Sequence, residues 1–186
     1  MVNLFYLDHD PNKCSKYYCD KHVIKIIVEI LQILSQIHHN IGSKKPPYKK
    51  CKAIHESLAP YRWASHSIGN YKYCINLAKS LIEEYKFRFN KNSHKSEKAL
   101  IWLENNIPDN IKHKNKTKYL LTNNVIIYSH YFNNIITASR YMYVDFKCSE
   151  DKWTNRNIPE WFKKVDKILN RKKNILIDKI IGICKK

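Results

Sequence analysis

Glycine and acidic residues are scarce in this 186-residue chain. It contains 3 glycines, and 16 Asp and Glu stand against 34 Lys and Arg. Isolated glycines cannot build the glycine-rich phosphate loops of Walker or dinucleotide-binding motifs, so those classes of nucleotide-binding protein are excluded. The low glycine content, together with many Lys, Asn, Ile and Tyr, favours a helix-rich protein. AT-rich codons encode the same residues and account for part of this composition.

Paired cysteine motifs and a signal peptide are also absent. None of the 6 cysteines stands in a CxxC pair, and Asp8 and Asp10 follow the short apolar start, which is unlike a secretory signal. Reduced thiols in an intracellular protein are the simplest interpretation, whether in the cytoplasm, the nucleus or a viral replication site. The spacing of Cys14, Cys19 and His22 matches no standard zinc motif, so we expect no metal and no other cofactor.

One apolar segment is long enough to organise the fold. In residues 20–39, DKHVIKIIVEILQILSQIHH, the polar side chains recur at steps of three and four and share one stripe of a helix: His22, Lys25, Glu29, Gln32 and Gln36. The rest of the circumference is mostly Val, Ile and Leu. We therefore predict an all-α protein, a single helical domain around this central buried helix, with a short extended N-terminal segment. Because Lys25 and Glu29 interrupt the apolar run, no membrane span is predicted.

Basic loops are expected to join the remaining helices. Residues 1–162 are predicted to form the helical core domain and residues 163–186 a basic helical extension. Further helices are expected at 60–68, 70–89, 95–105 and from 122 or 123 to 141, with Gly69-Asn70 as the break between the first two. Residues 43–52, SKKPPYKKCK, carry five lysines and no acid, so they predict an exposed loop that is either merely solvated or in contact with phosphates.

The net charge of +18 indicates a polyanionic partner, with nucleic acid (DNA in particular) ahead of an anionic membrane. The oligomeric state is left open. Candidate phosphate-binding cations are Arg62, Lys72, Lys152 and Arg156. Trp63 and Trp153 stand beside them, where each can either stack on a base or pack in the core.

Several motifs together resemble a known family. They are FYLDHDP near the start, C-D-K-H-V-x-K-x-x-x-E-x-x-Q-x-L from Cys19, HES-x5-W from His55, NYKY and EYKFRF-x-K-x-x-HKSE between Asn70 and Glu97, and W-x-x-R-x-x-PEWF from Trp153. On these residues the chain resembles a family of small, mostly uncharacterised proteins of bacteriophages and large DNA viruses. The likeness extends to Phe162, leaves the tail from Lys163 as an addition, and implies no specific activity.

The chain is also similar, more weakly, to the phage-type pyrimidine-dimer DNA glycosylases (endonuclease V). The similarity rests on Asn3-Leu4 and on the central helix, where Glu29 follows His22 two turns later. It implies that Glu29 is a catalytic carboxylate that stabilises a sugar cation and assists β-elimination. It also implies that the α-amino group, on Met1 or on Val2 after removal of Met1, attacks C1′ of the damaged nucleotide.

Neighbouring residues on the same helix complete this hypothesis. Lys25, Val28 and Gln32 stand where that family has arginines beside the glutamate. Lys25 is the alternative nucleophile, and His22 and Gln32 would shape the site. An ordinary pair between Lys25 and Glu29, one turn apart on a solvent-facing edge, explains the same residues without any catalysis.

Three functions therefore stay open. The first is a DNA glycosylase or AP lyase-like enzyme of DNA repair or processing. The second is a non-catalytic, basic, helical protein that binds DNA or RNA. The third is an enzyme that acts on nucleotides or modified bases.

Overall fold

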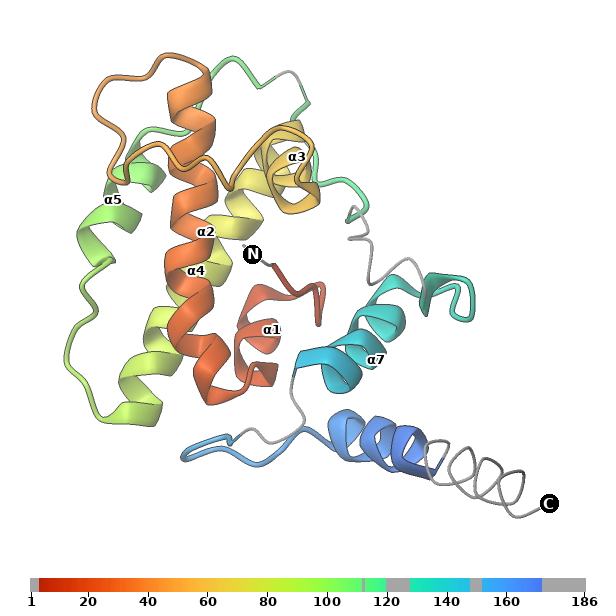
Figure 1. Cartoon of the computed structure of the whole chain (residues 1–186). Helices are drawn as coiled ribbons and strands as arrows, with labels where there is room; N and C mark the ends of the chain where they lie inside the picture. The colour runs from red at the N-terminus through yellow and green to blue at the C-terminus, as the bar shows by residue number, and fades with distance from the viewer. Residues whose placement is uncertain (1–3, 112, 120–127, 148–151, 172–186) are drawn as a thin grey trace.

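The computed structural model describes residues 4–111, 113–119, 128–147 and 152–171 (Figure 1). Its named helices are α1 (Pro11–Tyr17), α2 (Asp20–Asn40), α3 (Ala59–His66), α4 (Ile68–Phe89), α5 (Glu97–Asn105) and α7 (Ile135–Lys147). Residues 160–171 are helical as well. The described residues contain no β-strand, only one isolated parallel bridge between Ser67 and His113, and the predicted all-α class is confirmed. None of the described helices combines the length and apolarity needed to cross a bilayer.

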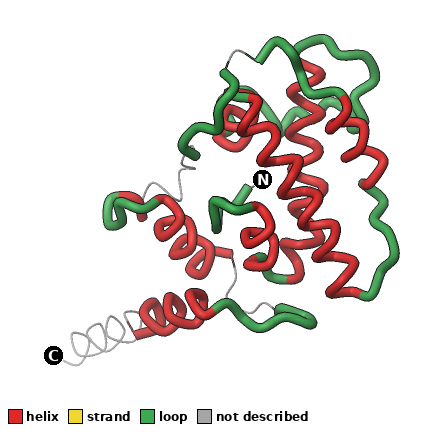
Figure 2. The backbone as a smooth tube through the Cα atoms, turned by 180° about the vertical axis from the view of Figure 1, so that it is seen from behind, coloured by secondary structure: helices red, strands yellow, loops and turns green. Residues whose placement is uncertain are grey.

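The two longest helices, α2 and α4, pack against each other through the middle of the molecule (Figures 1 and 2). Ile26 and Leu34 of α2 are fully buried, and so are Leu77 and Leu81 of α4. Each buried side chain of this size contributes about 1.5–3 kcal/mol relative to exposure, so this contact is a major source of stability. The segment predicted as the central helix corresponds to α2.

A capping serine sets the break between α3 and α4. Ser67 is extended, with φ −147° and ψ 154°, and its hydroxyl oxygen accepts a hydrogen bond from the Asn70 N–H at 3.0 Å. A serine that satisfies this otherwise free N–H stabilises the start of a helix. Gly69 and Asn70 therefore lie in the first turn of α4, and the break predicted at these two residues is wrong.

The helix predicted to end at Tyr141 is also only partly right. Residues 120–127 lie outside the described part of the chain, residues 130–134 are not helical, and α7 begins at Ile135. The Asn134 side-chain oxygen accepts a hydrogen bond from the Ile136 N–H at 2.8 Å. This local bond competes with continuation of a helix from the preceding residues and starts a new one.

The segment before α1 inserts into an aromatic core. Tyr6 stacks on Tyr119 with ring centroids 4.9 Å apart and lies edge-on to Trp63 at 5.8 Å. The Tyr119 hydroxyl donates a hydrogen bond to the Leu4 carbonyl at 2.5 Å, which ties this segment to residue 119. Trp63 is 0% exposed. It therefore packs in the core and offers no face on which a nucleic-acid base can stack.

Residues 113–117 cross directly over the start of α4. The N–H groups of Ile68 and Gly69 donate to the carbonyls of His113 and Lys114 at 2.8 and 2.9 Å. A Cβ on Gly69 would lie only 2.2 Å from the backbone nitrogen of Lys116, so the crossing requires glycine at this position. It holds the loop after α5 against α3 and α4.

Candidate nucleic-acid interface

The polar edge of α2 begins with His22, which is buried rather than solvent-facing. Its Nδ1 lies 3.0 Å from the Cys19 sulfur and 2.8 Å from the Tyr143 hydroxyl, and its ring lies 4.9 Å from that of Phe5. His22 is 6% exposed and Cys19 is 0% exposed. The cluster therefore joins the start of α2 to α7 and to the N-terminal segment in a place that a substrate cannot reach.

Lys25 and Glu29, one helical turn apart, form an ion pair. The Lys25 Nζ lies 3.2 Å from Glu29 Oε1, and the side chains are 55% and 9% exposed respectively. The carboxylate is thus shielded while the ammonium group faces solvent. Gln32 is half-buried on the same edge. Met1 and Val2, which carry the predicted nucleophilic amine, lie outside the described residues.

No metal site is found among the residues described. They contain no group of three or more His, Cys, Asp or Glu side chains able to hold a metal ion.

The last turns of α2 fix the basic loop at residues 43–52, called the lysine loop below. Gln36 Oε1 accepts a hydrogen bond from the Cys51 N–H at 3.0 Å, and His39 Nε2 donates to the Tyr48 carbonyl at 2.8 Å. The Tyr48 hydroxyl lies 2.9 Å from the Ser96 hydroxyl beside α5. These bonds hold the loop backbone without using any of its lysine side chains.

The lysines of this loop are all exposed: Lys44, Lys45, Lys49, Lys50 and Lys52. None of them pairs with an acid in the described part of the chain. The loop therefore presents five uncompensated positive charges on a fixed backbone. An arrangement of this kind attracts a polyanion.

A pocket of about 470 Å³ is lined by α3, the end of α2, Glu56 and residues 110, 111 and 113. We call it the α3 pocket. Two of its lining residues, Ile41 and Glu56, stand shortly before and after the lysine loop in the chain. Arg62 is exposed in its lining and has no acid partner among the described residues. His66 and His113 stack on one another with centroids 4.6 Å apart and planes at 22°. Of these three residues, only Arg62 was predicted from the sequence to bind nucleic acid.

The opposite end of α2 carries a cluster of paired charges, called the charged junction below: Asp20, Glu84, Arg88 and Arg156. The fully buried Arg88 donates from Nε to Glu84 at 2.7 Å and from Nη1 to Asp20 at 3.0 Å. Arg156 donates from Nε and Nη2 to the two oxygens of Glu84 at 2.8 and 2.9 Å. The junction thus links α2, α4 and the segment before residue 160.

Electrostatics at the charged junction favour the paired state. Burial by itself would raise the pKa of the Glu84 carboxyl, but hydrogen bonds from Arg156 and Arg88 outweigh burial and lower it. The charge of Arg156 is therefore balanced by Glu84. Its role in this structure is to dock a segment, not to present a free cation to phosphate.

The neighbouring candidates in residues 152–156 lie differently from one another. Trp153 is 6% exposed, packs on Phe162 at 4.8 Å and donates from Nε1 to the Tyr17 carbonyl at 3.3 Å. It is therefore part of the core and does not offer an open stacking surface. Lys152 is exposed, as is Lys72 on α4, and neither residue lines a described pocket.

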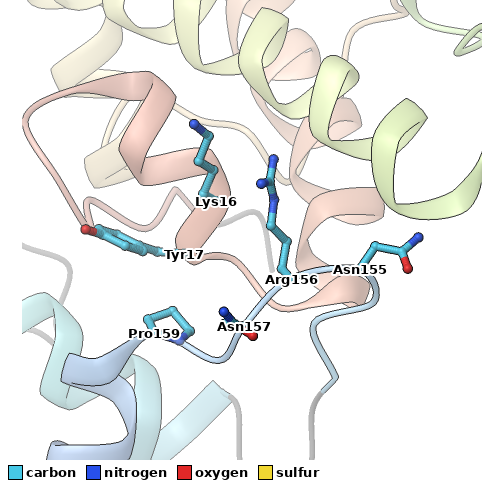
Figure 3. Close-up of a pocket in the computed structure, with 6 residues that line it drawn as sticks. All are labelled: Lys16, Tyr17, Asn155, Arg156, Asn157 and Pro159. Atoms are coloured by element: carbon cyan, nitrogen blue, oxygen red, sulfur yellow. The ribbon is translucent and has the colours of Figure 1, made fainter.

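A larger pocket, of about 610 Å³, lies beside the charged junction (Figure 3). Lys16 and Tyr17 at the end of α1 line one side, and residues 155–157 with Pro159 line the other. Figure 3 shows Lys16 and Arg156 extending in the same direction, but Arg156 is already paired with Glu84. A net positive surface is better supplied by the lysine loop, whose five cations are all exposed.

Comparisons with protein-family models, curated proteins and solved structures found no match to this chain. Its function must be inferred from its own residues.

Proposed function

We propose that this protein binds nucleic acid through its basic end, which comprises the lysine loop and the α3 pocket. The lysine loop directly follows α2, whose end lies in the upper part of Figure 1, and the α3 pocket is lined by residues of α3, the end of α2 and the loop after α5. The observation that carries the proposal is the lysine loop itself. Its five lysines are exposed and without acid partners in the described chain, while α2 fixes its backbone.

Fixed, unpaired cations suit a phosphate backbone for two reasons. Each lysine that neutralises a phosphate releases condensed counterions, which favours binding and makes it depend on salt. A loop that is already ordered loses less conformational entropy on binding than a flexible one. The absence of a Gly-rich phosphate loop is consistent with a contact made by side chains rather than by backbone N–H groups.

Fluorescence anisotropy with labelled DNA and RNA, single- and double-stranded, tests this proposal over about 50–300 mM salt. Replacing the five loop lysines by glutamine should weaken binding more than about tenfold at low salt. It should also flatten the slope of log affinity against log salt by about 0.7–0.9 for each phosphate that a lysine no longer neutralises.

A matched control replaces five exposed basic residues elsewhere by glutamine: Lys13, Lys91, Lys164, Lys167 and Arg171. This variant has the same net charge as the loop variant and should bind distinctly more tightly. Equal losses in the two variants would mean that total charge, not the lysine loop, determines binding. Salt-independent binding, or none to any of the four nucleic acids, would refute the proposal.

A second candidate is glycosylase or AP lyase chemistry on the bound DNA. It is favoured by the shielding of Glu29 beside the exposed ammonium group of Lys25. A primary amine condenses with the C1′ aldehyde of an abasic site with loss of water, and borohydride reduces the imine to a stable adduct. Trapping with abasic or dimer-containing DNA should give a covalent adduct that Glu29→Gln diminishes. No adduct with wild-type protein near neutral pH would exclude this chemistry.

A further inference from the structure

We propose that the α3 pocket holds one unstacked nucleotide and prefers a base that carries an exocyclic amino group. This inference rests on the proposed function, because the lysine loop would hold the neighbouring phosphates of the strand. It adds the class of ligand and a preference among bases.

The size and lining of the α3 pocket suit a single nucleotide. Its volume of about 470 Å³ falls in the range of about 300–1,000 Å³ typical of small-molecule sites. Ile41, which directly follows α2, and Ile111, in the loop after α5, supply accessible apolar surface. Ile41 is 38% exposed, so part of its apolar surface faces solvent. A base that covered these side chains would remove apolar area from water.

The paired histidines supply an aromatic surface in the same pocket. Their rings are nearly parallel, at 22°, and both side chains are exposed. The hydrogen bond from the Ile68 N–H to the His113 carbonyl, at 2.8 Å, places His113 beside the end of α3. Histidine rings are among the side chains on which unstacked bases pack in single-stranded recognition. A base can therefore stack on the outer face of either histidine ring.

Arg62 is the cation of this pocket. It is exposed on α3 and pairs with no acid in the described chain, including Glu56 across the same pocket. A guanidinium without a protein partner can donate two parallel hydrogen bonds to one phosphate. Arg62 thus differs from Arg156, whose equivalent donors already bind Glu84.

Glu56 gives the pocket its preference. Its carboxylate only accepts hydrogen bonds, so it complements the amino group of cytosine and repels the carbonyl that uracil or thymine presents at the same position. Asn40 Nδ2 lies 3.5 Å from this carboxylate and donates to the Tyr61 hydroxyl at 2.8 Å, which positions one side of Glu56.

Titration of the full chain with cytidine and uridine 5′-monophosphate, followed by NMR of the histidine ring protons, tests this inference. A mononucleotide has no neighbouring phosphates for the lysine loop to bind, so the result reports on the pocket alone. We expect His66 and His113 to shift and cytidine monophosphate to bind about fivefold more tightly. Glu56→Gln should bring the two affinities together, because an amide both donates and accepts. Arg62→Gln should weaken both nucleotides, whereas Lys13→Gln on α1 should leave both unchanged.

The failures of the two proposals are distinguishable. If oligonucleotides bind through the lysine loop but neither mononucleotide shifts the two histidines, the pocket inference is wrong and the proposed function stands. If mononucleotides bind as expected but no oligonucleotide binds, the pocket inference stands and the proposed function is wrong. Equal affinity for the two nucleotides would overturn the stated preference. Urea unfolding of each variant separates a defect in binding from a defect in folding, and the exposed positions of Glu56 and Arg62 predict little change.

Discussion

The two ends of α2 use positive charge in opposite ways. At its start, Arg88 is fully buried and bound to Glu84 and Asp20, and Arg156 adds two hydrogen bonds to Glu84. At its end, the lysine loop and Arg62 face solvent without acid partners in the described chain. A buried cation must be compensated within the fold, whereas an exposed one is solvated and stays available to a ligand.

This difference shows how misleading a count of cations is. Arg62 and Arg156 were equally good candidates for phosphate binding in the sequence, each near an aromatic residue. The structure leaves Arg62 free in a pocket and places Arg156 against Glu84. The same contrast applies to the large net charge, because cations such as Arg88 and Arg156 are already paired with a carboxylate inside the fold.

The largest expected effect that tests this comparison is at Arg88. Arg88→Met should lower the free energy of unfolding by about 3–5 kcal/mol, because Glu84 and Asp20 lose a buried partner. Urea denaturation followed by circular dichroism measures the change. The lysine-loop variant, in the same assay, should stay within about 0.5 kcal/mol of wild type. A loss below about 1 kcal/mol in Arg88→Met would mean that the junction is not a structural ion-pair network.

A smaller effect is expected from pH, and it should appear at different pH values for the two ends. Burial, with His39 nearby, lowers the pKa of His38 beside the lysine loop. The unfolded chain therefore takes up this proton first, and stability should fall as pH drops from about 6.5 toward the lowered pKa. The pKa of Glu84 is lowered too, so its contribution is complete above about 4.3 and is lost as pH falls through the folded-state value.

Urea unfolding measured from about pH 7.5 to pH 3 resolves these two steps. His38→Gln should reduce the step nearer neutrality, while Arg156→Gln should shrink the acid step because it removes two of the hydrogen bonds that lower the Glu84 pKa. A single step that neither substitution alters would contradict the assignment of pH sensitivity to these groups.

Some of the candidate site was accessible from the sequence. The absence of acids from residues 43–52 indicated an exposed basic loop, and the polar stripe on the central helix contained Gln36, which holds that loop. His113 and Glu84 were not indicated, because their partners His66 and Arg156 are far away along the chain. The sequence also does not show whether Trp63 and Trp153 pack in the core or stack on a base, because an indole ring suits either environment.

The sequence by itself determined that this protein is helical, that residues 20–39 form its main apolar segment, and that its charge is strongly positive. Those properties follow from local periodicity and composition, which are read without knowing the fold. Only the tertiary structure decided which cations are neutralised, because an ion pair or a ring contact depends on distances between segments that the fold brings together. The charged junction and the α3 pocket are therefore results of packing, although every residue in them is printed in the sequence.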